Sequence, residues 1–305
     1  MIAGLAKNYL RMLGVILIFL VGACNSDRGK DDSLQVTSDE LTPDSTVAEG
    51  IQSVKQIFYS LPSPLETALI LKRSGARYNE EILNPVGNVS RYNTSKSMAL
   101  NLGIYSTDLS YASLFDQTQA TIKFMTASKK MAENLGILNA IDNSVIQRLE
   151  ENVNNRDVIM ETISETFLNT SSILEEDDRI AIGSIILVGG WIEGLYIATS
   201  LVEDVQSTDN ELVDRIVDQK FSLGTVLNLL NQSIENADIK DIYSDIVELQ
   251  KIYEEIQISA SKVEVLQNGK SKVATLSSKN VVSVSPAVFS KLKEKVKELR
   301  SKYTA

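Results

Sequence analysis

The feature that most constrains this chain is a run of twenty residues, Ile180 to Thr199 (IAIGSIILVGGWIEGLYIAT), with Glu193 as its only charge. A helix that is apolar on every face must be buried in a protein core or lie in a membrane, and this run is long enough to span one. Its glycines, which favour close approach by other helices, are Gly183, Gly189, Gly190 and Gly194. The Gly190–Gly194 spacing also resembles a membrane helix-dimer face. We nevertheless predict a buried central helix over about 178–205, because the amphipathic segments around it need a surface to pack on.

Most of the remaining chain predicts amphipathic helices. Apolar residues recur every three to four positions from about 46 to 302, whereas the alternation typical of strands is scarce. The predicted helices cover about 51–61, 64–75, 95–113, 117–135, 142–153, 156–171, 175–206, 209–233, 239–266 and 286–302. A long structured loop is expected over 76–94. The sequence therefore predicts an all-α protein, a multi-helix bundle or array of about ten helices around the central one.

One segment near the C-terminal helix is compatible with two structures. Asn268-Gly269 can end the helix predicted over 239–266 as a C-cap, or it can turn a hairpin between 263–265 and 273–275. We favour the cap. The Ser- and Val-rich stretch at 277–285 allows a short extended piece.

Several kinds of site are excluded by the composition. The 305 residues include no His and one Cys, so the chain has no Ser-His-Asp triad, imidazole metal site, intrachain disulfide or Cys-rich metal site. We predict no metal and no cofactor. The formal net charge of −10 argues against nucleic acid as a partner, because binding it needs a dense basic surface.

Enzyme motifs are also missing from the sequence. It contains no phosphate-binding P-loop, no glycine-rich dinucleotide fingerprint and no Gly-x-Ser-x-Gly elbow. Glycoside hydrolysis needs two carboxylates across a cleft, and the 40 acidic residues permit such a pair without marking one. A non-enzymatic role is therefore favoured, and an enzyme acting on an envelope glycan through acidic residues is the alternative.

The N-terminal segment has the features of an export signal. Lys7 and Arg11 precede an apolar run from Met12 to Val21, which is too short for a membrane span. The run ends in Val21-Gly22-Ala23-Cys24, and these small residues before the single cysteine resemble the lipobox of bacterial lipoproteins. The resemblance implies a signal peptide at 1–23, cleavage before Cys24, and acyl chains on that residue. An ordinary secretory signal is the alternative.

Behind the cysteine, residues 24–48 are polar and acidic, which predicts a flexible tether to a single helical domain at 49–305. Cleavage would remove Lys7 and Arg11 and change the formal net charge from −10 to −12. The acidic residues close behind Cys24 resemble the surface-export signal of some Bacteroidota lipoproteins. We expect a lipid anchor in the outer membrane and leave the face open.

One candidate ligand site lies in the helix predicted over 95–113. Helical spacing places Asn101, Tyr105 and Asp108 on one face, with Tyr111 one turn beyond. This polar and aromatic set suits a pocket for a small polar or sugar-like ligand. The alternative is a hydrogen-bond network that fixes how the helices pack.

The second candidate is Glu193, with Trp191 and Tyr196 close in sequence. A carboxylate in an apolar core must be paired, hydrogen-bonded or protonated. Glu193 is therefore either part of a ligand or proton site, or one half of a buried pair with an Arg or Tyr from another helix. If it binds a ligand, we expect a concave face between the helix at 95–113 and the central helix.

Two charged stretches have simpler explanations. The acidic residues at 175–178 suit the first turn of a helix, where they favour the positive end of its dipole. Residues 291–302 carry six cations and two glutamates, a net charge of +4. This second stretch is either a patch for anionic lipid or glycan, or a solvated helix face.

The body of the chain also resembles a group of uncharacterised helical lipoproteins of Bacteroidota. The resemblance rests on Leu61-Pro62-Ser63-Pro64-Leu65-Glu66, on Asn84-Pro85 and on the run from Asn101 to Tyr111. It implies location and fold class only. The expected function is binding or scaffolding in the cell envelope, with the membrane and an envelope protein as partners; an accessory subunit of a membrane complex is a further alternative.

Overall fold

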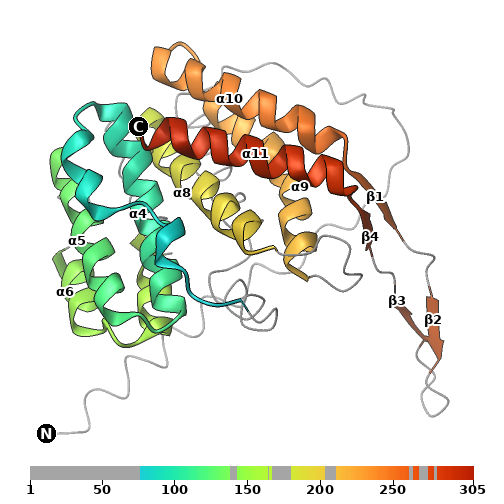
Figure 1. Cartoon of the computed structure of the whole chain (residues 1–305), viewed down its shortest axis with the longest axis horizontal. Helices are drawn as coiled ribbons and strands as arrows, with labels where there is room; N and C mark the ends of the chain where they lie inside the picture. The colour runs from blue at the N-terminus through green and yellow to red at the C-terminus, as the bar shows by residue number, and fades with distance from the viewer. Residues whose placement is uncertain are drawn as a thin grey trace, which may run out of the picture. The chain divides into compact units, whose positions relative to one another are not determined.

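A computed structural model describes residues 76–137, 143–163, 165–166, 180–202, 211–260, 264–267, 274–277 and 280–305 (Figure 1). The predicted signal peptide at 1–23, the tether with Cys24, the two helices before residue 76 and the acidic cluster at 175–178 lie outside the described residues. The described part is mainly helical, which confirms the all-α, multi-helix fold.

The helices follow the predicted ranges closely. Two short 3-10 helices, η1 (Glu80–Ile82) and η2 (Val86–Arg91), lie in the structured loop expected at 76–94. Residues 156–163 are also helical. The long helices are α4 (Ser95–Leu114), α5 (Thr118–Asn134), α6 (Asn143–Glu151), α8 (Ile180–Leu201), α9 (Glu211–Asn231), α10 (Ala237–Glu254) and α11 (Pro286–Tyr303).

Local capping residues set the helix ends. Thr94 and Ser97 form a reciprocal capping box at the start of α4. The side chain of Asn236 accepts hydrogen bonds from the first amides of α10, and Ser285 does the same for Val288 at the start of α11. After α5, Gly136 adopts a φ of +66°, a left-handed conformation that suits a glycine at a helix end.

The prediction for the end of α10 was wrong. The helix ends at Glu254 instead of 266, and four short strands follow it: β1 (Gln257–Ala260), β2 (Glu264–Gln267), β3 (Ala274–Ser277) and β4 (Asn280–Ser283). Strand β1 pairs with β4, and β2 with β3, both antiparallel. The less favoured antiparallel pairing of these segments is therefore present, and Asn268-Gly269 lie outside the described residues. β-branched residues such as Ile258, Val265 and Val281 favour extended backbone here over a continued helix.

Helix α8 is the central helix that its composition predicts. It packs against α4, α9, α10 and α11, and its buried residues cover all sides of the helix. Among the described helices, α8 alone is long and apolar enough to cross a membrane. Because 61% of its most apolar window is buried inside the fold, its place matches that of a core helix.

Glycines let α4 and α8 approach closely. A Cβ atom on Gly103 would lie 2.0 Å from the carbonyl oxygen of Ile186, and one on Gly189 would lie 2.1 Å from that of Leu100. Gly190 also faces α4, because its carbonyl accepts a hydrogen bond from Thr107 Oγ1 at 3.1 Å. The predicted close approach is thus confirmed at these positions, whereas a Cβ on Gly194 would meet nothing within 4 Å.

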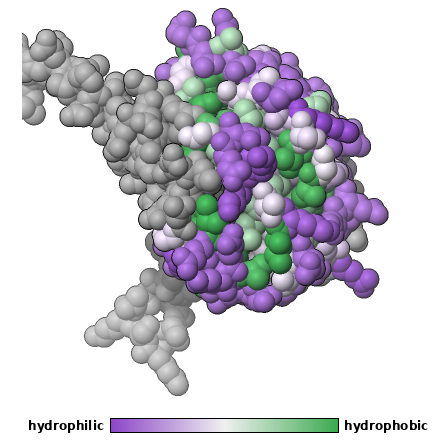
Figure 2. Space-filling view, turned by 90° about the vertical axis from the view of Figure 1, so that its left-hand side faces the viewer, coloured by the Kyte–Doolittle hydropathy of each residue, from purple (hydrophilic) through white to green (hydrophobic). Residues whose placement is uncertain are grey.

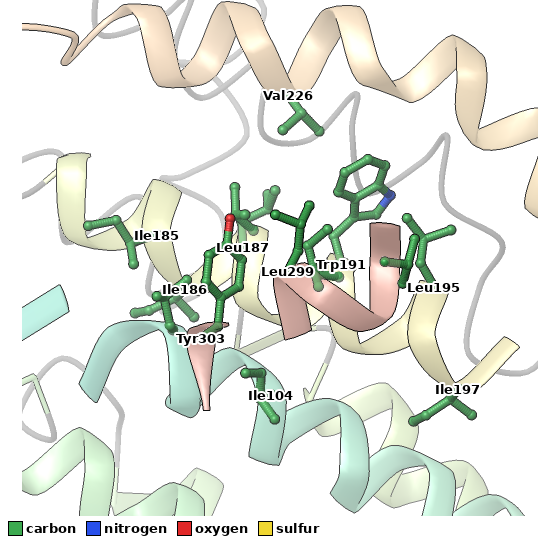
Figure 3. Close-up of a cluster of buried hydrophobic side chains, with 14 of the residues drawn as sticks. Ile104, Ile185, Ile186, Leu187, Trp191, Leu195, Ile197, Val226, Leu299 and Tyr303 are labelled. Atoms are coloured by element: carbon green, nitrogen blue, oxygen red, sulfur yellow. The ribbon is translucent and has the colours of Figure 1, made fainter. Parts of the chain in front are cut away.

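Helix α11 closes the core with one face and pairs with α10 through another. Its buried residues recur at helical spacing and are Phe289, Leu292, Val296, Leu299 and Tyr303. Figure 3 shows Leu299 and Tyr303 among the apolar side chains of α8. On the exposed side, Lys295 and Lys302 form ion pairs with acidic residues of α10, and Lys291 pairs with Glu255 just after it. Much of the basic stretch at 291–302 is therefore neutralised within the protein instead of forming a free basic patch.

Candidate functional site

The two candidate clusters from the sequence meet inside the protein. Asn101, Tyr105 and Asp108 of α4 and Glu193 of α8 each have 0% of their surface exposed. They lie where α4, α8, α11 and the segment 76–94 come together. The close contacts at Gly103 and Gly189 bring α4 and α8 side by side at this point.

Arg300 of α11 provides the positive charge at this junction. Its Nε donates to Glu193 Oε2 at 3.1 Å and its Nη2 donates to Oε1 at 3.3 Å, so the guanidinium makes a bidentate interaction with the carboxylate. The same Nη2 also donates to the carbonyl of Ile82 at 3.3 Å. The guanidinium carbon lies 4.8 Å from the centre of the Tyr196 ring, a cation–π distance. Glu193 is thus paired with an Arg from another helix, one of the two alternatives open in the sequence.

Asp108 contacts the same carboxylate from the side of α4. Its Oδ2 accepts a hydrogen bond from the backbone N–H of Asn84 at 3.1 Å, and its carboxyl interacts electrostatically with that of Glu193. Burial raises the pKa of Asp108 well above its ordinary value, and the nearby charge of Glu193 raises it further. Burial also raises the pKa of Glu193, but there Arg300 counteracts it. Burial alone would lower the pKa of Arg300, but Glu193 outweighs that effect and raises it.

Asn84 and Asn101 link α4 to two other parts of the fold. The Nδ2 of Asn84 donates to Tyr92 Oη and to Asn101 Oδ1, both at 3.0 Å. In turn, the Nδ2 of Asn101 donates to the carbonyls of Ser97 and Tyr303, both at 2.9 Å. Asn101 therefore connects the segment 76–94 to the end of α11.

The two tyrosines of the α4 set hold the segment 76–94 against the helix. Tyr105 Oη donates to the carbonyl of Pro85 at 3.0 Å. Tyr111 Oη accepts from the backbone N–H of Asn79 at 3.2 Å, and its ring stacks on Tyr78 with centroids 5.4 Å apart. These tyrosines bind backbone and ring partners within the chain, so their positions are accounted for without a ligand.

Trp191 is separate from this junction. Its Nε1 donates to Gln219 Oε1 of α9 at 3.1 Å, and its ring lies among apolar side chains of the core (Figure 3). Of the two aromatic residues expected near Glu193, Tyr196 joins the network through Arg300, and Trp191 helps to join α8 to α9.

Sequence reasoning missed Asn84 and Arg300 as members of the network. Arg300 follows Leu299 in the buried stripe of α11, so it lies at the edge of the packed face. It is also the only Arg among the cations of 291–302. Arginine suits a partly buried, bidentate ion pair with a carboxylate better than lysine does. A single Arg among five Lys is therefore the sequence feature that could have indicated its pairing with Glu193.

The geometry favours a packing network over a ligand pocket. Nearly all the polar atoms named above have partners within the chain, and the carboxyls of Asp108 and Glu193 have no surface open to solvent. Ligand binding by the candidate residues stays a prediction, because no contact in the described fold requires a ligand. These residues are Asn101, Tyr105, Asp108, Tyr111, Trp191, Glu193 and Tyr196.

No group of three or more acidic or Cys residues in the described part could hold a metal ion. No protein-family model matches the chain, and no curated protein or solved structure matches it significantly.

Proposed function

We propose that the protein is a lipid-anchored lipoprotein of the bacterial cell envelope, with a non-enzymatic binding or scaffolding role. The observation that carries this proposal is Val21-Gly22-Ala23-Cys24 directly behind a basic and apolar signal segment. Acyl chains on Cys24 would supply the anchor, and two or more chains are what stable anchoring requires. The acidic residues behind Cys24 favour the outer membrane.

The character of the helical domain supports a binding role over an enzymatic one. Asp108 and Glu193, the two carboxyls proposed for a ligand site, are buried inside the described domain, which leaves its surface as the place for recognition. On the face drawn in Figure 2, hydrophobic residues are interleaved with hydrophilic ones. Among the described residues, the large hydrophobic side chains most exposed are Phe221, at 63%, and Ile122, at 38%.

Two other functions have less support. A glycan-cleaving enzyme would need substrate access to paired carboxyls, and the pair between α4 and α8 has none in the described fold. An accessory subunit that inserts α8 beside an integral membrane partner would have to withdraw a helix that packs against four others in the domain.

The lipid anchor can be tested in a bacterial host by labelling with a clickable palmitate analogue, followed by membrane fractionation. We expect the wild-type protein to be labelled and membrane-bound, and Cys24→Ser to be unlabelled and released from the membrane. The matched control combines Cys24→Ser with Ser26→Cys, which keeps a thiol but moves it out of the lipobox.

This control should also be unlabelled, because the lipobox defines the modified position and not merely the presence of a thiol. Mass spectrometry of the wild-type N-terminus can contradict the proposal. A mature chain that begins at another residue and carries a free Cys24 thiol would show an ordinary secretory signal.

A further inference from the structure

We infer that Asp108 and Glu193 form a buried proton-binding site, and that the bound proton keeps helix α11 attached to α4 and α8 through Arg300. The inference concerns the interior of the helical domain and does not depend on the proposed lipid anchor.

The charge balance of the site calls for a proton. Two carboxyls with 0% exposure share one guanidinium, whose side chain is 14% exposed. If both carboxyls were ionised, the site would hold a net charge of −1 in the protein interior. An uncompensated buried charge is strongly unfavourable, and uptake of one proton makes the site neutral.

The hydrogen bonds place the proton on Asp108. Both oxygens of Glu193 already accept from Arg300, which stabilises Glu193 as the carboxylate. Asp108 receives one N–H, from Asn84 to Oδ2, and its Oδ1 has no donor among the described residues. A proton on Asp108 gives this carboxyl an O–H group that can donate, which the ionised form lacks.

The other elements around Asp108 supply no second positive charge. The charged or titratable groups facing it are Glu193 from α8, Arg300 from α11, Tyr78 from the segment 76–94 and Tyr105 of α4 itself. Lysines of α5 form ion pairs at the surface, Lys123 with Glu80 and Lys129 with Glu150. In the described part, Arg300 is thus the one cation available to the carboxyl pair.

The proton is coupled to α11 because Arg300 belongs to that helix. Arg300 donates to Glu193 and to the carbonyl of Ile82. The carbonyls of Tyr303 and Thr304 accept hydrogen bonds from Asn101 and Tyr92 at the same end. When this end of α11 opens, water reaches the two carboxyls, the pKa of Asp108 returns toward its ordinary value and the proton leaves. The attachment therefore weakens as pH rises.

Hydrogen exchange on the full mature chain, read by mass spectrometry at a series of pH values, tests this coupling. After correction for the intrinsic exchange chemistry, the opening constant of residues 299–304 should rise up to tenfold per pH unit, because opening releases one proton. In Asp108→Asn, the side-chain amide donates to Glu193 in place of the proton, and this extra pH dependence should disappear.

The matched control is Asp245→Asn. Asp245 pairs with Lys302 at the same end of α11, at 2.8 Å, but lies outside the carboxyl pair. This variant should keep the wild-type pH dependence. If Asp108→Asn behaves like Asp245→Asn, the proton does not control the attachment of α11 and the inference fails.

A second measurement covers the case in which Asp108→Asn does not fold. Infrared spectroscopy of the wild-type protein with isotope-labelled aspartate should show the C=O stretching band of a protonated carboxyl at neutral pH. Absence of that band would mean that Asp108 is ionised, and the inference that it holds the proton would be wrong.

Discussion

Arg300 supplies the positive charge for two carboxyl groups that come from different helices. Removing it leaves Glu193 buried without a cation, and breaking a buried pair from one side typically costs about 3–5 kcal/mol. We therefore expect Arg300→Met to lower the free energy of unfolding by about that amount, as measured by urea denaturation followed by circular dichroism.

Arg148 provides the surface counterpart for this test. It also contacts two carboxylates, of Glu161 at 2.7 Å and of Glu165 at 2.8 Å, but its side chain is 39% exposed. Arg148→Met should cost less than about 1 kcal/mol, because exposed ion pairs contribute little. Equal losses for the two variants would contradict the importance assigned to burial of the Arg300 site.

The polar face of α4 was predictable residue by residue, and its partners were not. Helical spacing alone places Asn101, Tyr105 and Asp108 on one side of the helix. The meeting of Asp108 with Glu193 depends on how α4 and α8 are aligned, which no local pattern specifies. Arg300 lies 107 positions from Glu193 in the sequence, so that pairing follows from the assembled fold only.

At the level of helices, the contact between α4 and α8 depends on the lack of a side chain at Gly103. An added Cβ would lie 2.0 Å from the Ile186 carbonyl oxygen and 2.6 Å from the backbone nitrogen of Gly190, so the two backbones would have to separate. We expect Gly103→Ala to destabilise the protein by about 1–3 kcal/mol or more, as overpacked cores do, in thermal and urea unfolding.

Gly194 is the control for this substitution because it lies in α8 and a Cβ there meets nothing within 4 Å. Gly194→Ala should be neutral or stabilise the protein by up to about 1 kcal/mol, through better helix propensity. If both alanine variants raise the stability, the helices are not in close contact at Gly103.

The elements themselves were largely predictable from apolar spacing and caps, with the strands after α10 as the exception. The apolar spacing of α10 continues to about residue 266, so the sequence predicts a longer helix than the one that ends at Glu254. Strand pairing between segments that are distant in sequence, such as Ile258 with Val282, is set by contacts that this local pattern does not contain.

The paired strands between α10 and α11 should contribute little to the stability of the helices. Two-stranded ribbons are marginally stable by themselves in water. Because Gln257 and Ser283 are paired, a short Gly-containing turn can replace residues 258–282. We expect the melting temperature to change by no more than a few degrees, and the helical circular dichroism signal to remain. A large loss of helix signal would show that the strands support the helices.

For the whole molecule, two groups give the pH dependence opposite signs. The folded pKa of Asp108 is raised by burial, so its contribution is fully present below the ordinary Asp pKa of about 3.9 and is lost as pH rises through the folded value. The pKa of Asp241 is lowered by its hydrogen bond from Lys96, so its contribution is lost as pH falls. We expect greatest stability on the acidic side of neutral.

Urea unfolding between about pH 3 and about pH 8 measures this profile. Above the maximum, the free energy of unfolding should fall by up to about 1.4 kcal/mol per pH unit, which corresponds to one proton. Asp108→Asn should flatten that decline. If the free energy of unfolding of this variant still falls with pH as in the wild type, groups other than Asp108 cause the fall.

The bonds between α11 and the segment 76–94 also have a consequence for biosynthesis. Tyr92 and Thr304 are separated by 212 positions, and Arg300 and Ile82 by 218. A nascent chain that has emerged only as far as α10 has Glu193 without its cation and Asn101 without its carbonyl, so the native core cannot yet close. If the chain is exported unfolded, as the proposed signal peptide implies, dependence on a late-synthesised helix would delay folding until most of the chain has crossed the membrane.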